Sequence, residues 1–443
     1  MTNKPAPAAA LQGSLLRSIQ HFFRLQASGG ILLLLASAAA LICANTDLAP
    51  LYHHLWEIPV RFNIGSFIID KTLHDLVNDG LMAVFFFLVG LEIKREVLAG
   101  ELSTRKKAVL PISAALGGML APALLYAAFN AGGAGVHGWG IPMATDIAFA
   151  LGVLALLGKR VPIGLVVFLT ALAIADDLGA VLVIALFYGG QIAPAPLMIG
   201  AVIVTLSVAL NRAGVRSTLV YGLLGVVLWL AFLKSGVHAT VAGILLAMTI
   251  PTRTALTEAQ FDHRVRQLID QFTVRNDRRS ALERDQAQQT IIRQIEMASH
   301  EIEPPLQRIE HHLHPWVTFA IVPIFAFANA GVDISAQALT SAVSDPVTLG
   351  VAVGLVVGKQ IGVMLFSWIP VRLGWAELPA GATWRHLYGV SWLAGIGFTM
   401  SLFITYLAFS DQHLIEQAKI GILLASLIAG VVGYGILATV SRR

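Results

Sequence analysis

The sequence predicts an all-α integral membrane protein with twelve transmembrane helices. Hydrophobic residues make up 56% of the 443 residues and charged residues only 13%, whereas soluble domains carry about 25% charged residues. The mean hydropathy of +0.74 points the same way. At about 20 residues per span, a chain of this length has room for about 11–13 helices.

The apolar segments follow one another along the chain with short polar connections. They lie near 29–48, 74–98, 108–129, 143–158, 162–187, 195–211, 217–233, 237–250, 315–331, 346–368, 386–409 and 415–439. The fourth and the eighth are short for a span. With residues 1–28 as an N-terminal cytoplasmic or interfacial segment, the chain divides into helices one to eight (29–250), a charged insertion (251–314) and helices nine to twelve (315–443).

The distribution of basic residues supports this count and sets the orientation. If both termini are cytoplasmic, only Arg61, Lys71, Lys234 and Lys419 fall in external segments, and the remaining basic residues of the connections lie inside, as the positive-inside rule requires. A net charge of +4 would suit a nucleic-acid partner, but this placement indicates topology and a lipid bilayer instead. The single cysteine, Cys43, excludes an internal disulfide and a cysteine-based metal site.

Two connecting segments are long enough to have structure of their own. Residues 50–72 lie outside and contain the alternating stretch VRFNIGSFIID, which predicts a small external β-hairpin. Residues 251–314 form a long cytoplasmic insertion rich in Arg, Gln and Glu with helical character. Such a long connection is usually functional or disordered, and a solvated linker is the simpler interpretation.

Two adjacent carboxylates, Asp176 and Asp177, lie inside the fifth apolar segment. A charge at this depth is costly, so it indicates a functional site; a solvent-exposed loop is the alternative, and the long apolar flanks argue against it. Adjacent residues of a helix point about 100° apart. One carboxylate can therefore line a cavity while the other pairs with a neighbouring helix.

Polar and small residues interrupt one apolar segment in each half of the chain. Pro142, Thr145 and Asp146 break the fourth segment, and GIGFT at 395–399 breaks the eleventh. Corresponding breaks in two halves indicate an inverted-repeat transporter with a site near the midplane. Thr145 offers a hydroxyl to a hard cation, while Asp146 either ligates the ion or balances the charge of the exposed helix ends.

Lys359 is the one basic residue deep inside a span, in VAVGLVVGKQIGVML. A buried ammonium needs a partner, and Asp146, Asp176 and Asp177 are the candidate anions; snorkelling to the interface is the alternative.

A hard monovalent cation competes with protons for such carboxylates. Burial and a neighbouring negative charge both favour the protonated carboxyl group. The pair would bind a cation, the transported Na⁺, at high pH and protons after the cation leaves on the other side. We therefore predict exchange by competition at one shared site, which moves charge if two carboxylates discharge for one cation.

A second group of titratable residues lies at the cytoplasmic helix ends. Helix two ends with Glu92, Arg95 and Glu96, and helix nine begins with Glu310 and His311. Histidines and carboxylates together could set a pH threshold; an ordinary solvated helix end is the simpler interpretation. His238 lies on the outer side, before helix eight.

Six separated stretches resemble the NhaA family of Na⁺/H⁺ antiporters. They are ALAIADDLGAVLVIALFY, ATDIAFALGVLALLG, MAVFFFLVGLEIKRE, SGVHATVAGI, LHPWV with PIFAFANAGV, and GKQIG, and the resemblance runs from about residue 16 to residue 440. Inverted repeats with broken helices are described for this family in general terms.

The resemblance implies electrogenic exchange of cytoplasmic Na⁺ or Li⁺ for external H⁺, activated at alkaline pH, in a bacterial inner membrane and without a cofactor. By matching motif, Asp176 and Asp177 would carry cation and protons, with Asp177 the more direct ligand and Asp176 paired with Lys359. Thr145 and Asp146 would belong to two crossing, unwound chains.

The resemblance also assigns roles outside the cation site. It places Glu92, Arg95, Glu96, Glu310 and His311 in a pH-sensing region, and His238 at a position that affects the pH profile. The 50–72 hairpin would mediate a homodimer. The insertion at 256–303 departs from the family pattern.

Two other functions compete with this hypothesis. A channel or a sodium–solute symporter would need further polar positions for its substrate, and the spans offer none. An intramembrane aspartyl protease is the enzyme alternative, but its aspartates lie on two helices with a GxGD motif, which this sequence lacks. We therefore predict a secondary transporter and not an enzyme.

Overall fold

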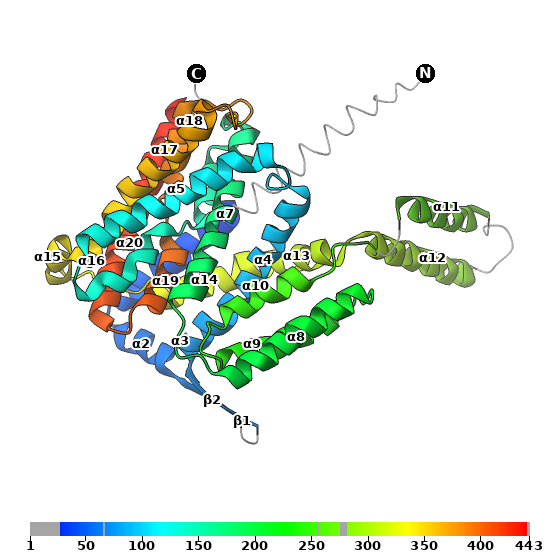
Figure 1. Ribbon diagram of the computed structural model, residues 1–443. Helices are drawn as coiled ribbons and strands as arrows, with labels where there is room; N and C mark the ends of the chain where they lie inside the picture. The colour runs from blue at the N-terminus through cyan, green and yellow to red at the C-terminus, as the bar shows by residue number, and fades with distance from the viewer. Residues whose placement is uncertain (1–26, 65–66, 255–256, 275–280, 441–443) are drawn as a thin grey trace.

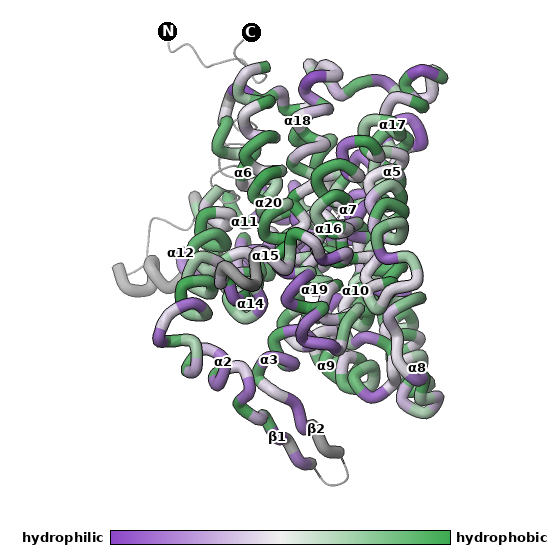
Figure 2. The backbone as a smooth tube through the Cα atoms, turned by 90° about the vertical axis from the view of Figure 1, so that its left-hand side faces the viewer, coloured by the Kyte–Doolittle hydropathy of each residue, from purple (hydrophilic) through white to green (hydrophobic). Residues whose placement is uncertain are grey.

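The computed structural model describes residues 27–64, 67–254, 257–274 and 281–440. Almost all of the predicted N-terminal segment 1–28 lies outside these residues. The described chain is a bundle of helices from which two strands project at one end and a pair of helices at one side (Figure 1). Figure 2 shows hydrophobic stretches along most of the bundle helices.

Within the described residues, seven helices are long and apolar enough to cross a membrane, and nine spans result if two bent helix pairs are counted. The seven are Ala27–Ala44, Leu73–Ala99 (α3 Leu73–Leu76, the π-helix η1 Val77–Leu81 and α4 Met82–Ala99), α5 (Arg105–Phe129), α7 (Ile163–Phe187), α8 (Pro194–Arg212), Pro346–Arg372 (α16 Pro346–Val353, the π-helix η5 Gly354–Gly358 and α17 Lys359–Arg372) and α20 (Gln412–Val440). Two shorter apolar helices are α9 (Thr218–Leu233) and α10 (Thr240–Thr249).

Large aliphatic side chains remain exposed on the outside of this bundle. Leu124 on α5 is 70% exposed, Leu186 on α7 is 75% exposed and Leu219 on α9 is 70% exposed. Extensive exposure of large apolar side chains marks contact with a membrane or a partner, and the lengths of the helices match the hydrocarbon core of a bilayer. The protein is therefore a multi-pass membrane protein. The count of twelve transmembrane helices and the inverted repeat remain predictions from the sequence.

Both predicted helix breaks are confirmed. The 3₁₀-helix η2 (Ala134–Met143) and α6 (Ile147–Leu156) meet at a 42° bend, and α18 (Trp384–Ala394) and α19 (Phe398–Ala408) meet at a 43° bend. A short 3₁₀ turn, η3 (Gly158–Arg160), follows α6. The breaks fall where the sequence places Pro142, Thr145 and the glycines of GIGFT.

The segment 50–72, which we predict to be external, is partly helical. Residues Ala49–Glu57 form α2, which begins with a proline in its first turn, a favourable position because that residue needs no backbone donor. The strands β1 (Pro59–Ile64) and β2 (Phe67–Thr72) then pair antiparallel, in register from Pro59 with Thr72 to Ile64 with Phe67. The strand pairing is therefore narrower than the predicted segment.

The insertion 251–314 contains two complete helices, α11 (Glu258–Val274) and α12 (Ala281–Ile302), and the beginning of a third. They lie against each other and project away from the bundle (Figure 1), and an ion pair joins Arg264 to Glu301 at 2.9 Å. Next, α13 (Pro305–Trp316) continues through the π-helix η4 (Val317–Ile321) into α14 (Val322–Asn329). Helix nine thus begins at Pro305, a few residues before the predicted start at Glu310, because prolines at 304 and 305 favour a helix start there. The helix α15 (Ala336–Ser344) leads to α16.

Helices α5 and α17 approach each other closely enough for backbone contact. A Cβ atom added at Gly362 would lie 2.0 Å from the carbonyl oxygen of Gly117, and one added at Gly117 would lie 2.2 Å from that of Gly362. Small residues at such crossings allow transmembrane helices to pack tightly. Because α17 begins with Lys359, this contact fixes the depth of that lysine.

We expect Gly362→Ala to destabilise the protein by about 1–3 kcal/mol, because the new methyl group overlaps backbone atoms that cannot move aside. The thermal unfolding midpoint in detergent measures this. Gly222→Ala is the matched control, since a Cβ atom at Gly222 meets no atom within 4 Å and alanine is the better helix former. Equal midpoints for the two variants would contradict the proposed close contact.

Candidate functional site

The two helix breaks lie directly against each other in the middle of the bundle. The backbone N–H of Asp146 donates to the carbonyl oxygen of Ile396 at 2.7 Å, and the hydroxyl of Thr145 donates to the carbonyl oxygen of Ala394 at 2.8 Å. Broken helices leave backbone groups without intrahelical partners. Here Thr145 and Asp146 of one unwound segment donate to two carbonyl oxygens of the other, so some of these backbone groups find partners across the two breaks.

Asp146 uses its carboxylate to cap both half-helices that begin at these breaks. Its Oδ1 accepts from the backbone N–H of Phe149 at 2.9 Å, in α6. Its Oδ2 accepts from the backbone N–H of Thr399 at 3.0 Å and from the Thr399 hydroxyl at 2.5 Å, in α19. A carboxylate is favourable at helix N-termini. These contacts fit a role for Asp146 in balancing the partial positive charges of the two helix N-termini, which is one of the two roles that the sequence left open.

Lys359 is completely buried and has three acceptors for its ammonium group. It donates to Asp176 Oδ2 at 2.8 Å, to the Thr145 hydroxyl at 2.9 Å and to the carbonyl oxygen of Met143 at 2.5 Å. An ammonium has three N–H donors, so all of them are used. The π-helical turn η5 directly precedes Lys359, and such turns often occur at functional sites.

Asp176 is the aspartate that pairs with Lys359, and neither side chain is exposed to solvent. The two opposite charges together make a locally neutral unit inside the bundle. Removing one partner of such a pair leaves an uncompensated buried charge. The second oxygen of Asp176, Oδ1, has no hydrogen-bond partner among the described residues.

Asp177 lies one residue further along α7, is 1% exposed, and differs sharply from its neighbour. Neither of its carboxylate oxygens has a hydrogen-bond donor within the part of the chain that the structure describes. An ionised carboxylate in this setting would cost several kcal/mol. Asp177 is therefore stable only with a proton or a bound cation.

The predicted cytoplasmic group is largely brought together. Arg95 on α4 donates a hydrogen bond to Glu310 on α13 and lies 3.6 Å from Glu96. Glu96 in turn accepts from the backbone N–H of Glu101 at 2.9 Å. Glu310 is 8% exposed; burial raises the pKa of its carboxyl group, and the Arg95 guanidinium opposes that rise. Glu310 consequently holds its proton to a higher pH than an exposed glutamate does.

The remaining residues of the predicted pH-sensing set differ in their surroundings. Glu92 is half-buried one turn before Glu96 on α4, and His311 is exposed on α13 next to Glu310. His238 lies apart from them: its Nε2 donates to the carbonyl oxygen of Tyr188 at 2.5 Å, just after α7 ends. The structure thus joins α4 with α13 but does not bring His238 to that group.

Comparison with known proteins covers almost the whole chain. The family model described as Na⁺/H⁺ antiporter 1 matches residues 20–437. The chain belongs to this family.

Individual relatives resemble the chain along nearly their full length. It is 50% identical to a protein of Syntrophobacter fumaroxidans, over 96% of this chain and 90% of that protein. It is 49% identical to one of Oleidesulfovibrio alaskensis (100% and 98%) and 50% identical to one of Acidithiobacillus ferrooxidans (97% and 99%). All three are named Na⁺/H⁺ antiporter NhaA. The resemblance to the NhaA family is therefore confirmed.

Sequence reasoning missed two groups in this antiporter-family site. Thr399 was noted as part of a helix break, but its hydroxyl is a direct partner of Asp146; a hydroxyl residue at the first turn after a break is the signal that could have indicated it. The Met143 carbonyl oxygen is a main-chain group. No side-chain pattern identifies it, because every residue carries one.

We expect Lys359→Ala to lower the free energy of unfolding by about 3–5 kcal/mol, because Asp176 would remain buried without its counter-charge. Thermal unfolding in detergent at neutral pH measures this. Adding Asp176→Asn should recover most of the loss. Arg264→Ala, which breaks an exposed ion pair, is the control and should cost less than about 1 kcal/mol. A double variant no more stable than Lys359→Ala would show that the buried pair has been misassigned.

Proposed function

We propose that this protein is a secondary transporter, not an enzyme, which exchanges cytoplasmic Na⁺ or Li⁺ for external H⁺ and needs no cofactor. Membership of a Na⁺/H⁺ antiporter family and relatives named Na⁺/H⁺ antiporter NhaA support the exchange of these two ions. The observation that carries the proposal is the buried, donor-free carboxylate of Asp177 beside the neutral Asp176–Lys359 pair. Such a carboxyl group can bind a proton or a cation, but an ionised carboxylate with neither would be strongly destabilised at this position.

Exchange follows from competition at Asp176 and Asp177. A Na⁺ ion requires oxygen ligands, and the oxygens without donors on these two residues are of the type that hard cations prefer. A cation that engages Asp176 weakens the attraction that holds the Lys359 ammonium. Asp177, Asp176 and Lys359 are then the binding residues proper, and Thr145 and Asp146 hold the unwound segments around them.

Electrogenic transport follows from the charges at this site. One Na⁺ brings a single positive charge to two carboxylates. The return step carries two protons if Asp177 is protonated together with either Asp176 or a Lys359 that released its proton when the cation bound. The protonated site and the cation-loaded site then differ by one unit of charge. Each cycle then moves one net charge, so the membrane potential can drive export of the cation.

Activation at alkaline pH is supported by the group that joins α4 to α13. Glu310 faces Arg95, Glu96 and Glu92 on α4 and lies beside His311 on its own helix. As the pH rises, Glu310 loses its proton and its ion pair with Arg95 strengthens, which changes the contact between the two helices. His238, on the opposite flank of the site, would influence the profile separately.

The membrane location and assembly are also proposed. A bacterial inner membrane with both termini cytoplasmic agrees with the distribution of basic residues. The described sheet has only the two strands β1 and β2, so its outer edges are open, and open edges are templates for pairing with another chain. A homodimer through the 50–72 segment would cover them.

We expect Asp177→Asn to abolish exchange, because an amide can neither bind a proton nor balance a cation. In everted vesicles with an imposed ΔpH, Na⁺ and Li⁺ should collapse the gradient for the unmodified protein, K⁺ should not, and the variant should respond to none. Asp47→Asn, an exposed aspartate, is the matched control. Normal exchange by the Asp177 variant would remove this residue from the cation site.

We expect Glu310→Gln to shift the pH profile of exchange toward alkaline pH, because glutamine mimics the protonated carboxyl group and cannot form the charged pair with Arg95. The half-maximal pH of Na⁺-dependent dequenching measures the shift. Glu301→Gln changes an exposed glutamate on the neighbouring α12 and should leave the profile unchanged. An unaltered profile for Glu310→Gln would exclude this residue from pH regulation.

A further inference from the structure

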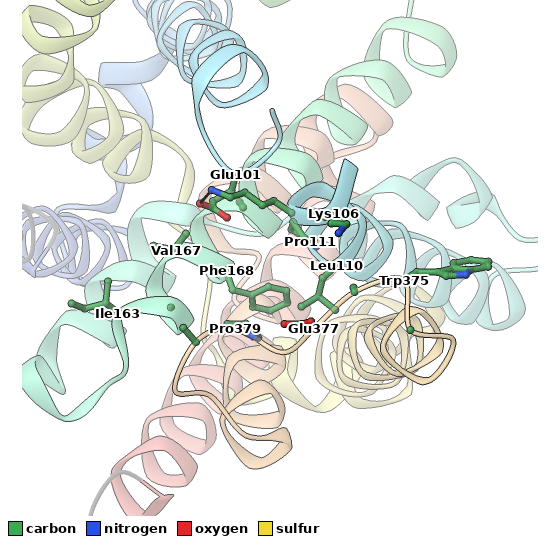
Figure 3. Close-up of a pocket in the computed structure, with 16 residues that line it drawn as sticks. Glu101, Lys106, Leu110, Pro111, Ile163, Val167, Phe168, Trp375, Glu377 and Pro379 are labelled. Carbon is green, nitrogen blue, oxygen red and sulfur yellow. Dashed lines mark hydrogen bonds and ion pairs between the residues drawn. The ribbon is translucent and has the colours of Figure 1, made fainter. Parts of the chain in front are cut away.

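A cavity of about 770 Å³ lies apart from the cation site, between the first turns of α5, the first turns of α7 and the loop after α17 (Figure 3). Its lining combines four charged side chains, those of Glu101, Lys106, Lys107 and Glu377, with large apolar ones such as Ile163 and Trp375. No residue of the proposed cation site contributes to the lining. The volume is within the range of small-molecule sites.

The charges in this cavity balance, but only half of them are paired. Lys107 and Glu101 form an ion pair at 3.2 Å. Lys106 on α5 and Glu377 on the loop after α17 have no ion-pair partner among the described residues, although both line the cavity. Figure 3 shows the two side chains on separate elements of the lining. One cation and one anion therefore remain available to a ligand.

The beginning of α5 adds further positive charge at this place. Its first turn carries Arg105, Lys106 and Lys107 and no acidic residue, and Thr104 at the N-cap makes no side-chain capping bond. The N-terminus of a helix is itself partially positive. Three cations there repel the helix dipole, and an anion in the adjoining cavity would relieve this repulsion, as phosphate groups do at helix N-termini.

The exposed part of the cavity lining is mixed, because Lys106, Lys107 and Glu377 are exposed together with large apolar residues. Three large apolar lining residues are exposed: Ile163 at 52%, Val167 at 37% and Trp375 at 63%. Tryptophan concentrates at the boundary between hydrocarbon and headgroups. Exposed charges on one part of the lining and exposed apolar side chains on another suit a ligand with a polar head and an apolar tail.

We propose that this cavity binds the headgroup of a phosphatidylethanolamine, a phospholipid with both a phosphate and a primary ammonium. The phosphate would lie at Lys106 and the N-terminus of α5, and the ammonium would donate to Glu377. The acyl chains would run along the exposed apolar side chains of Ile163 and Val167. A purely anionic headgroup would leave Glu377 facing negative charge, and a quaternary ammonium has no N–H to donate.

The test titrates the delipidated full-length protein in detergent with ethanolamine, choline and glycerol phospholipids that carry identical acyl chains. The readout is the rise of each protein's thermal unfolding midpoint above its own lipid-free value. We expect a saturable rise that is largest for phosphatidylethanolamine. Lys106→Gln should raise the half-saturating concentration of this lipid about tenfold, since a charge-assisted contact is lost.

Two further variants separate the contributions. Glu377→Gln should remove the preference for ethanolamine over choline while choline lipid still binds. Arg105→Gln removes the same charge from the same turn, but Arg105 does not line the cavity, so its half-saturating concentration should rise far less than that of Lys106→Gln. The proposal is overturned if no lipid gives a saturable rise, if phosphatidylglycerol binds as tightly as phosphatidylethanolamine, or if the Lys106 and Glu377 variants behave like the unmodified protein.

Discussion

The burial of the Lys359 ammonium against Asp176 is the constraint that explains the centre of this molecule. An ammonium at this depth needs three acceptors, and a straight helix has no carbonyl oxygens to spare for it. The break between η2 and α6 frees the Met143 carbonyl oxygen and places the Thr145 hydroxyl beside it. The unwound chain then has backbone groups without intrahelical hydrogen-bond partners. The opposing break provides the Ile396 carbonyl oxygen for one of them, and the Asp146 carboxylate accepts from the backbone N–H of Thr399. The burial of the Lys359 ammonium group thus accounts for the irregular backbone at the two helix breaks.

Much of this could be predicted from the sequence because charges are rare inside apolar segments. Asp176, Asp177 and Lys359 are conspicuous for that reason, and Pro142 with GIGFT locates both breaks. Sequence left open which aspartate pairs with Lys359, because residues 183 positions apart meet only through helix packing. Main-chain ligands such as the Met143 carbonyl oxygen carry no sequence signal. The helix α2 within 50–72 was missed because local alternation in the following strands dominated the interpretation.

Asp146 and Asp177 show how surroundings decide what a buried carboxylate does. The oxygens of Asp146 accept three hydrogen bonds from two helix beginnings, so its negative charge is compensated without any ion. Those of Asp177 accept none from the described residues. Identical side chains therefore divide into one whose charge is compensated by hydrogen bonds and one, Asp177, which we propose to be the exchangeable carboxylate. The donor set, rather than depth in the membrane, makes the difference.

The long sequence separation of these partners also has a consequence for biosynthesis. Asp176 leaves the ribosome 183 residues before Lys359, and Asp146 leaves 253 residues before Thr399. Proteins are synthesised from the N-terminus and fold in that order. Until its last spans arrive, the nascent chain therefore holds Asp176 without its Lys359 partner, and Thr145 and Asp146 without the carbonyl oxygens of the second break. Insertion of α17 and α19 completes the centre, so a chain truncated before α17 would expose its polar core to lipid and be a substrate for membrane quality control.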